Sequence, residues 1–102
     1  MKMARGTPDF FNRTFVTAAN DEQIKLSVTS SNSTATFSQI VAAFIIYNDG
    51  PNAIFVENDA AATTSKFKLP ARAWLMLDIP TTTVQCICES GNTATAYLWG
   101  FF

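Results

Sequence analysis

The sequence predicts an all-β protein, an antiparallel β-sandwich of jelly-roll or immunoglobulin-like type that forms a single domain. Apolar and polar residues alternate with period two over several short segments, as in strands with one buried face. Turn-forming residues interrupt these segments about every 8–12 residues. A length of 102 residues suits one hydrophobic core. We expect residues 1–12 to form an irregular N-terminal arm and residues 13–102 to form the sandwich.

The N-terminal half contains four predicted strands, over residues 13–17, 24–28, 34–38 and 41–47. The first is rich in strand-forming residues. In the second, which follows a polar turn at residues 20–22, apolar and polar residues alternate strictly. The fourth is apolar on both faces, which predicts a central strand.

The C-terminal half contains five further predicted strands, over residues 53–57, 66–69, 74–79, 84–89 and 93–99. Asn48-Asp49-Gly50-Pro51-Asn52 is a strong turn signal, so we expect the flanking strands to pair as a hairpin. Ser90-Gly91-Asn92 predicts a second hairpin in the same way. No segment has the pattern of a helix. The two inner surfaces of the sandwich are expected to draw on Phe44, Ile46, Phe55, Leu77 and Val84.

The composition favours a subunit whose surface is partly covered. Charged residues make up 15% of the chain, against about 25% in typical soluble domains. The net charge is −1, and nine phenylalanines add large apolar area. The few Lys and Arg residues form no basic run, which argues against nucleic-acid binding. Residues 40–47, the longest apolar stretch, are too few to span a bilayer, and no signal-peptide pattern is present, so we expect no membrane partner and synthesis in a cytoplasm.

The chain lacks the residues of common catalytic sites. It contains no histidine, which excludes Ser-His and Cys-His nucleophiles. Cys86 and Cys88 are expected to be buried free thiols, with a redox or metal role as the weaker alternative. Calcium could bind if two turns converged, but solvated turns explain the same residues better: Asp49, Asn52, Glu57, Asn58 and Asp59. We therefore predict no catalytic residue, no cofactor and no metal site.

Assembly is the function that the aromatic segment Tyr97-Leu98-Trp99-Gly100-Phe101-Phe102 favours. Such a segment needs cover, either from the protein's own core or from another subunit. The predicted partner-interface residues are Phe10, Phe11, Lys66, Lys68, Arg72, Trp99, Phe101 and Phe102. The three basic residues have an alternative use, since charges protect a sheet edge from aggregation. Tyr97 and Trp99, with Trp74, have the alternative of an aromatic platform for sugar.

Several segments carry a resemblance to a known group of proteins. A strand that ends in Tyr47-Asn48 is followed by a Gly- and Asn-containing turn and by Ala53-Ile54-Phe55-Val56. The later order is Leu69-Pro70-Ala71, Leu77-Asp78-Ile79, Cys86-Ile87-Cys88-Glu89-Ser90-Gly91 and Thr93-Ala94-Thr95-Ala96-Tyr97-Leu98. This order, over residues 40–99, resembles small virion proteins of tailed bacteriophages. The chain departs from them by having no polar tail after the last strand.

The resemblance implies a structural β-sandwich on the phage head or at the head–tail junction, without catalytic residues. We therefore predict a capsid decoration or cement protein that binds the major capsid protein or other virion subunits and forms a homo-oligomer. Its location would be the virion, assembled in the host cytoplasm. Two alternatives stay open: a carbohydrate-binding module, and a collar or tail component.

Overall fold

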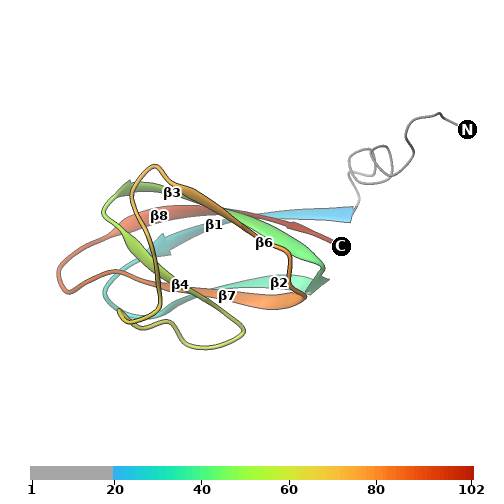
Figure 1. Ribbon diagram of the computed structural model, residues 1–102, viewed down its shortest axis with the longest axis horizontal. Coiled ribbons are helices and arrows are strands. Elements are labelled where there is room, and N and C mark those ends of the chain that lie inside the picture. Colours follow the sequence, from blue (N-terminus) through green and yellow to red (C-terminus); the bar gives the residue numbers. More distant parts are fainter. Residues whose placement is uncertain (1–19) are drawn as a thin grey trace, which may run out of the picture.

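Two four-stranded antiparallel sheets face each other in the computed structural model, which describes residues 20–102 (Figure 1). The first sheet contains, in spatial order, β1 (Asp21–Val28), β8 (Ala94–Phe101), β3 (Ala43–Pro51) and β6 (Trp74–Leu77). The second contains β2 (Ser33–Val41), β7 (Thr81–Ile87), β4 (Ile54–Asn58) and β5 (Phe67–Leu69). No α-helix occurs in residues 20–102. The predicted antiparallel β-sandwich is confirmed.

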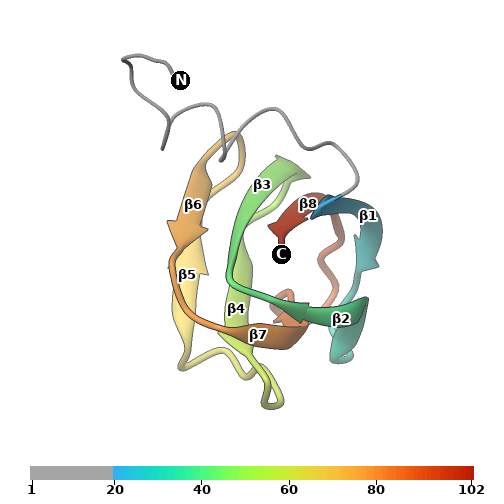
Figure 2. The same ribbon diagram turned by 90° about the vertical axis from the view of Figure 1, so that its right-hand side faces the viewer.

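The pairing of the strands identifies the topology. β1 pairs with β8, β2 with β7, β3 with β6 and β4 with β5, all antiparallel. The chain is therefore one long antiparallel ribbon that is rolled up, as the end view in Figure 2 shows. Two sheets of order 1-8-3-6 and 2-7-4-5 make a jelly roll. Of the two sandwich types that the sequence left open, the strand order selects this one.

Both predicted hairpins are wrong. β3 lies in the first sheet and β4 in the second, so the turn that joins them carries the chain across the sandwich. The same holds for β7 and β8. Turn residues mark where a chain reverses, but they do not decide whether the flanking strands pair with each other or with more distant strands. In each case the two strands contribute to one core from opposite sides.

Several strand boundaries differ from the prediction. β3 continues through the predicted turn to Pro51, with a register shift between Asn48 and Gly50, and Gly50 takes a φ of 84°. β1 begins at Asp21, inside the predicted polar turn, because Asp21 pairs with Phe101. Val41 belongs to β2 and not to β3. The predicted strands 74–79 and 84–89 correspond to β6 and β7, and the predicted strand 13–17 lies outside the described residues.

The core lies between the sheets. Its largest fully buried apolar side chains are Phe37, Phe44, Ile46, Ile54 and Leu98. Phe44, Ile46 and Val84 belong to the core cluster as predicted, and Leu77 packs against it. Phe55 is buried but is not in the cluster, since Ile54 and Val56 alternate with it and point inward instead. Cys86 and Cys88 are free and buried, as predicted.

Gly100 fits the core only because it has no side chain. A Cβ at this position would lie 2.6 Å from Phe37 Cε1 and 2.7 Å from Val41 Cγ1. Gly100 belongs to β8 of the first sheet, whereas both neighbours belong to β2 of the second. The two sheets therefore approach each other closely beside the last residues of β8.

Candidate functional site

The outward side of the first sheet carries large apolar side chains in register across β8, β3 and β6, with polar side chains beside them on β1. In one row, Lys25, Tyr97, Tyr47 and Trp74 stand opposite one another on β1, β8, β3 and β6. In the next row stand Gln23, Trp99, Ile45 and Met76. Asp21 and Phe101 begin a third row. We call this surface the outer face and define it by Asp21, Gln23, Lys25, Ile45, Tyr47, Trp74, Met76, Tyr97, Trp99 and Phe101.

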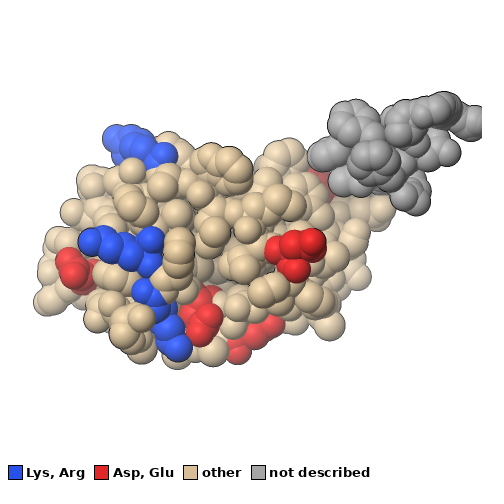
Figure 3. All heavy atoms as spheres, in the orientation of Figure 1, with Lys and Arg blue, Asp and Glu red and all other residues tan. Residues whose placement is uncertain are grey.

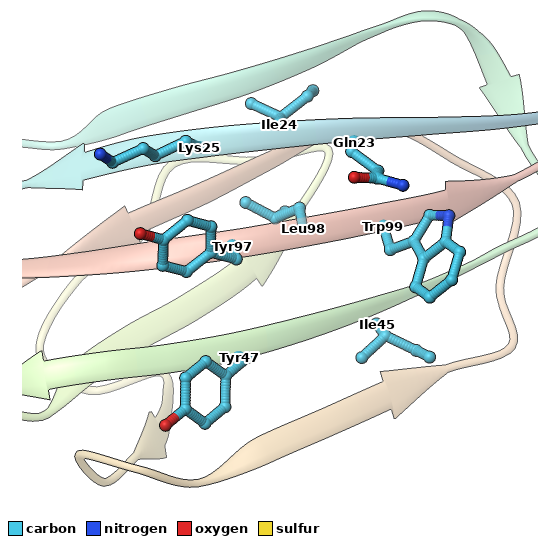
Figure 4. A pocket seen from close by; sticks show the side chains of 8 residues that line it. All are labelled: Gln23, Ile24, Lys25, Ile45, Tyr47, Tyr97, Leu98 and Trp99. Carbon is cyan, nitrogen blue, oxygen red and sulfur yellow. The ribbon is translucent and has the colours of Figure 1, made fainter.

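Alternation along the strands explains why these side chains point outward. In β6, Leu75 and Leu77 pack against the core, so Trp74 and Met76 point away from it. The same period places Tyr97 and Trp99 outward on either side of the buried Leu98. Figure 4 shows their rings projecting from β8, with Tyr47 and Ile45 projecting beside them from β3.

The exposure of the outer face is unusual for apolar side chains of this size. Trp74 is 65% exposed, Met76 54%, Trp99 44% and Tyr97 43%. At about 150–250 Å² for a whole aromatic side chain, these four leave roughly 500 Å² of mostly apolar surface in one patch. This is the size of the largest contiguous apolar patch on a typical monomer, and that patch is often functional. The outer face is therefore the candidate functional site.

Polar groups border this face along β1. The indole Nε1 of Trp99 donates a hydrogen bond to Oδ2 of Asp21, which orients the ring. Trp99 and Phe101 pack with their ring centroids 5.3 Å apart. Lys25 Nζ lies 5.9 Å from the centre of the Tyr97 ring, within cation–π range. The face thus has a polar edge at β1 and an apolar edge at β6.

A shallow hollow of about 460 Å³ opens on the outer face between β1, β8 and β3. Figure 4 shows the eight residues that line it. Its polar groups are the amide of Gln23, the ammonium of Lys25 and the hydroxyls of Tyr47 and Tyr97. No carboxylate lines it, so it lacks the pair of carboxyl groups that most glycosidases use. The hollow can accept a flat or apolar group.

The predicted basic contacts lie elsewhere, and two of them are engaged within the chain. Lys66 Nζ pairs with Glu57 Oε2 at 3.2 Å. Arg72 Nη1 donates to the carbonyl of Asp49, and Arg72 has a left-handed backbone with a φ of 68°. Lys68 is exposed on β5, the edge strand of the second sheet. Figure 3 shows that charged side chains are sparse on the visible surface and that most of it is uncharged.

The predicted aromatic contacts divide between the outer face and the core. Trp99 and Phe101 lie on the outer face. Phe102 is half-buried and packs against the core cluster, and its backbone N–H donates to the carbonyl of Asn20 at 2.8 Å. Its cover therefore comes partly from the chain itself. Phe10 and Phe11 lie outside the described residues.

The strand arrangement keeps the candidate calcium ligands apart. Asn52 precedes β4, whereas Glu57 and Asp59 lie at the other end of that strand, roughly 17 Å away at about 3.3 Å per residue. Asp59 Oδ1 instead accepts hydrogen bonds from the backbone N–H groups of Thr82 and Thr83 at 2.9 and 2.8 Å. Within residues 20–102, no three Cys, Asp or Glu side chains converge as metal ligands.

Comparison with known proteins adds no identification. No family model matches the chain, and no curated protein matches it. The resemblance to phage virion proteins therefore stays a prediction from the sequence. Residues 20–102 contain no helix that is long and apolar enough to cross a membrane.

Sequence reasoning missed half of the outer face. Trp74, Tyr97 and Trp99 were recognised as a possible platform, but Tyr47, Ile45 and Met76 were not. The signal was present, because residues 41–47 are apolar on both faces and only one face of a sheet in a two-layer sandwich meets the core. A central strand in such a sandwich exposes its second apolar face.

Proposed function

We propose that this protein is a structural virion subunit of a tailed bacteriophage, a capsid decoration or cement protein that strengthens the shell through contacts with neighbouring subunits. The outer face carries this proposal. Its rows of apolar side chains suit burial against another folded surface, and obligate interfaces have this apolar character. The virion as the specific assembly comes from the resemblance of residues 40–99.

The magnitude of the burial supports assembly. Covering the roughly 500 Å² left by the four most exposed side chains releases about 12 kcal/mol, at about 25 cal/mol per Å². Association costs an estimated 4–15 kcal/mol in lost translational and rotational freedom. The face is therefore large enough to offset most of that cost. Contacts elsewhere on the subunit would add the rest.

Purified particles test this proposal. Phage particles from a host that carries the gene are banded by density and probed for the chain by mass spectrometry and immunoblot. We expect the wild-type chain in the particle band, and loss of the double variant Trp74→Ser with Trp99→Ser. Phe67→Ser, which changes an aromatic residue that is 58% exposed on β5, is the matched control. A wild-type chain that is absent from particles would contradict the proposal.

A second candidate is a carbohydrate-binding module, and one observation favours it. Tyr97, Tyr47 and Trp74 lie side by side on three adjacent strands, so their rings form a row on which sugar rings could stack. This function predicts glycan affinity in the isolated chain, measured on a glycan array and lost in Trp74→Ala. Assembly predicts particle association without such affinity.

A further inference from the structure

We infer that the outer face binds the outer face of a second copy of this chain, related by a two-fold axis along the row of Gln23, Trp99, Ile45 and Met76. The inference rests on the proposed role as an assembly subunit and names the partner of that surface. A two-fold contact requires one surface that is complementary to itself. The arrangement of the outer face meets this requirement in its charges, in the placement of most of its apolar side chains and in its area.

The charges on β1 are complementary to themselves. Asp21 and Lys25 both point outward, two residues before and two residues after Gln23. They lie about 13 Å apart along the strand, too far to pair with each other in one chain. Rotation about an axis through Gln23 exchanges their positions. Lys25 of each copy then faces Asp21 of the other, which gives two ion pairs at the edge of the contact.

Most of the apolar side chains are complementary under the same rotation, which places Tyr47 opposite Ala43 and leaves Trp74 opposite a charged residue, Asp78, just beyond the end of β6. Trp99, Ile45 and Met76 lie on the axis and meet their own counterparts. Tyr97, one row away on β8, meets Phe101 of the second copy, so aromatic rings cover aromatic rings. The strands of the two copies run nearly parallel or antiparallel, the aligned geometry in which sheets pack face to face about 10 Å apart.

The area is close to what a stable dimer needs. The four most exposed side chains supply roughly 500 Å². The half-buried side chains of Ile45, Tyr47 and Phe101 and the polar edge on β1 add to this area. A standard interface buries about 800 Å² per partner. The outer face alone therefore accounts for most of a dimer interface.

Charge reversal with mixing tests the arrangement directly in the full-length chain. In Lys25→Asp the dimer would place two carboxylates together at each end, and in Asp21→Lys two ammonium groups. We expect each variant alone to be monomeric by sedimentation, with dimer affinity lowered at least tenfold. An equimolar mixture of the two restores both ion pairs and should recover a heterodimer. Lys68→Asp and Glu89→Lys make the same charge changes off the outer face and should leave the dimer unchanged.

Intrinsic fluorescence reports the same contact without a substitution. Trp74 and Trp99 are the two tryptophans of the chain, and both lie on the outer face. Their emission should shift to shorter wavelength as the concentration rises, over the same range in which sedimentation shows the dimer. Acrylamide quenching should fall in parallel. Circular dichroism of each variant checks that its fold is intact.

Each of the following results would contradict the inference that the outer face binds itself. A monomer at all concentrations with quenchable tryptophans shows that the face does not bind itself. A dimer that survives both charge reversals places the contact elsewhere. The tryptophans could instead be buried at every concentration and become exposed in the double variant Phe10→Ser with Phe11→Ser. That result would mean that the chain's own N-terminal segment covers the outer face. Dimer formation and particle association are separate readouts, so a monomer that still enters particles refutes the dimer and leaves the proposed function standing.

Discussion

The side-chain amide of Asn48 donates a hydrogen bond to the backbone carbonyl of Leu69 at 3.0 Å, and this bond joins the two sheets. Asn48 belongs to β3 in the first sheet and Leu69 to β5 in the second. The same nitrogen also donates to the carbonyl of Asn52, and Oδ1 accepts the N–H of Gly50 at 2.8 Å. One fully buried amide therefore fixes the end of β3, the start of the crossing to β4 and the end of β5.

Replacement of Asn48 by alanine should destabilise the domain strongly. The change leaves two buried or half-buried carbonyls and one N–H without their partner, at about 1–3 kcal/mol for each buried group. We expect the free energy of unfolding to fall by about 3 kcal/mol, measured by urea denaturation. Asn92→Ala, in the connection between β7 and β8, is the control and should change it by less than about 1 kcal/mol. Equal losses of unfolding free energy in the two variants would contradict the conclusion that the Asn48 side chain stabilises the contact between the sheets.

Replacement of Gly100 by alanine tests the close approach of the sheets. The added methyl would contact Phe37 and Val41 at distances that require them to move, so we expect a loss of about 1–3 kcal/mol from overpacking. Phe37→Leu should recover part of that loss in the double variant, as measured by thermal unfolding. Gly91→Ala gives the contrast, because a Cβ there meets nothing within 4 Å and only the φ of 82° opposes it. A double variant that is additive would show that Phe37 is not the obstacle.

The carboxyl of Asp59 should make stability depend on pH in the acid range. Hydrogen bonds from the backbone N–H groups of Thr83 and Thr82 lower the pKa of Asp59 below its ordinary 3.8. Because the folded pKa is lowered, this contribution is fully present above about pH 3.8 and is lost as the pH falls through the folded pKa. Asp59→Asn keeps an acceptor oxygen but does not titrate. Its melting temperature should therefore fall less than that of the wild type between pH 4 and pH 2, and parallel curves would exclude Asp59 as the source.

The two thiols should be inert while the chain is folded. Burial, with a smaller contribution from neighbouring Cys88, raises the pKa of Cys86 to about 12, and burial also raises the pKa of Cys88. Only the thiolate reacts with disulfide reagents. At pH 8 we expect no fast reaction with Ellman's reagent, and two thiols per chain after addition of guanidinium. Rapid labelling of the folded protein at either position would contradict the burial of these residues.

The alternation of apolar and polar residues predicted where the strands lie, but it did not predict which strands pair with each other. Alternation of Ile24, Leu26 and Val28 located β1 because burial on one face is a local property of a strand. The hairpins failed because pairing depends on contacts between distant segments, such as Phe55 with Ile87, and no local signal encodes them. Asn48 looked like a turn residue, since nothing in its neighbourhood shows that Leu69 will lie beside it.

Only part of the candidate site could be predicted from the sequence, again because local pattern does not encode which strands are neighbours. Tyr97 and Trp99 share a face by strand geometry alone, so their common orientation could be predicted. Trp74 joins them through Tyr47, which pairs with both neighbouring strands, and that adjacency comes from the jelly-roll order. Rows that run across a sheet appear only once the strand order is known.

The rolled ribbon also determines when the domain can form during synthesis. The indole of Trp99 bonds to the carboxylate of Asp21, 78 positions earlier in the chain, and among residues 20–102 the only strand beside β1 in its sheet is β8. Long-range pairing of this kind slows folding to milliseconds or seconds, because a large loop must close before any contact is gained. The first described strand therefore emerges from the ribosome long before its partner exists. Until β8 follows, β1 lacks its partner strand, and its exposed Gln23 and Lys25 are the polar residues that oppose aggregation at such an edge.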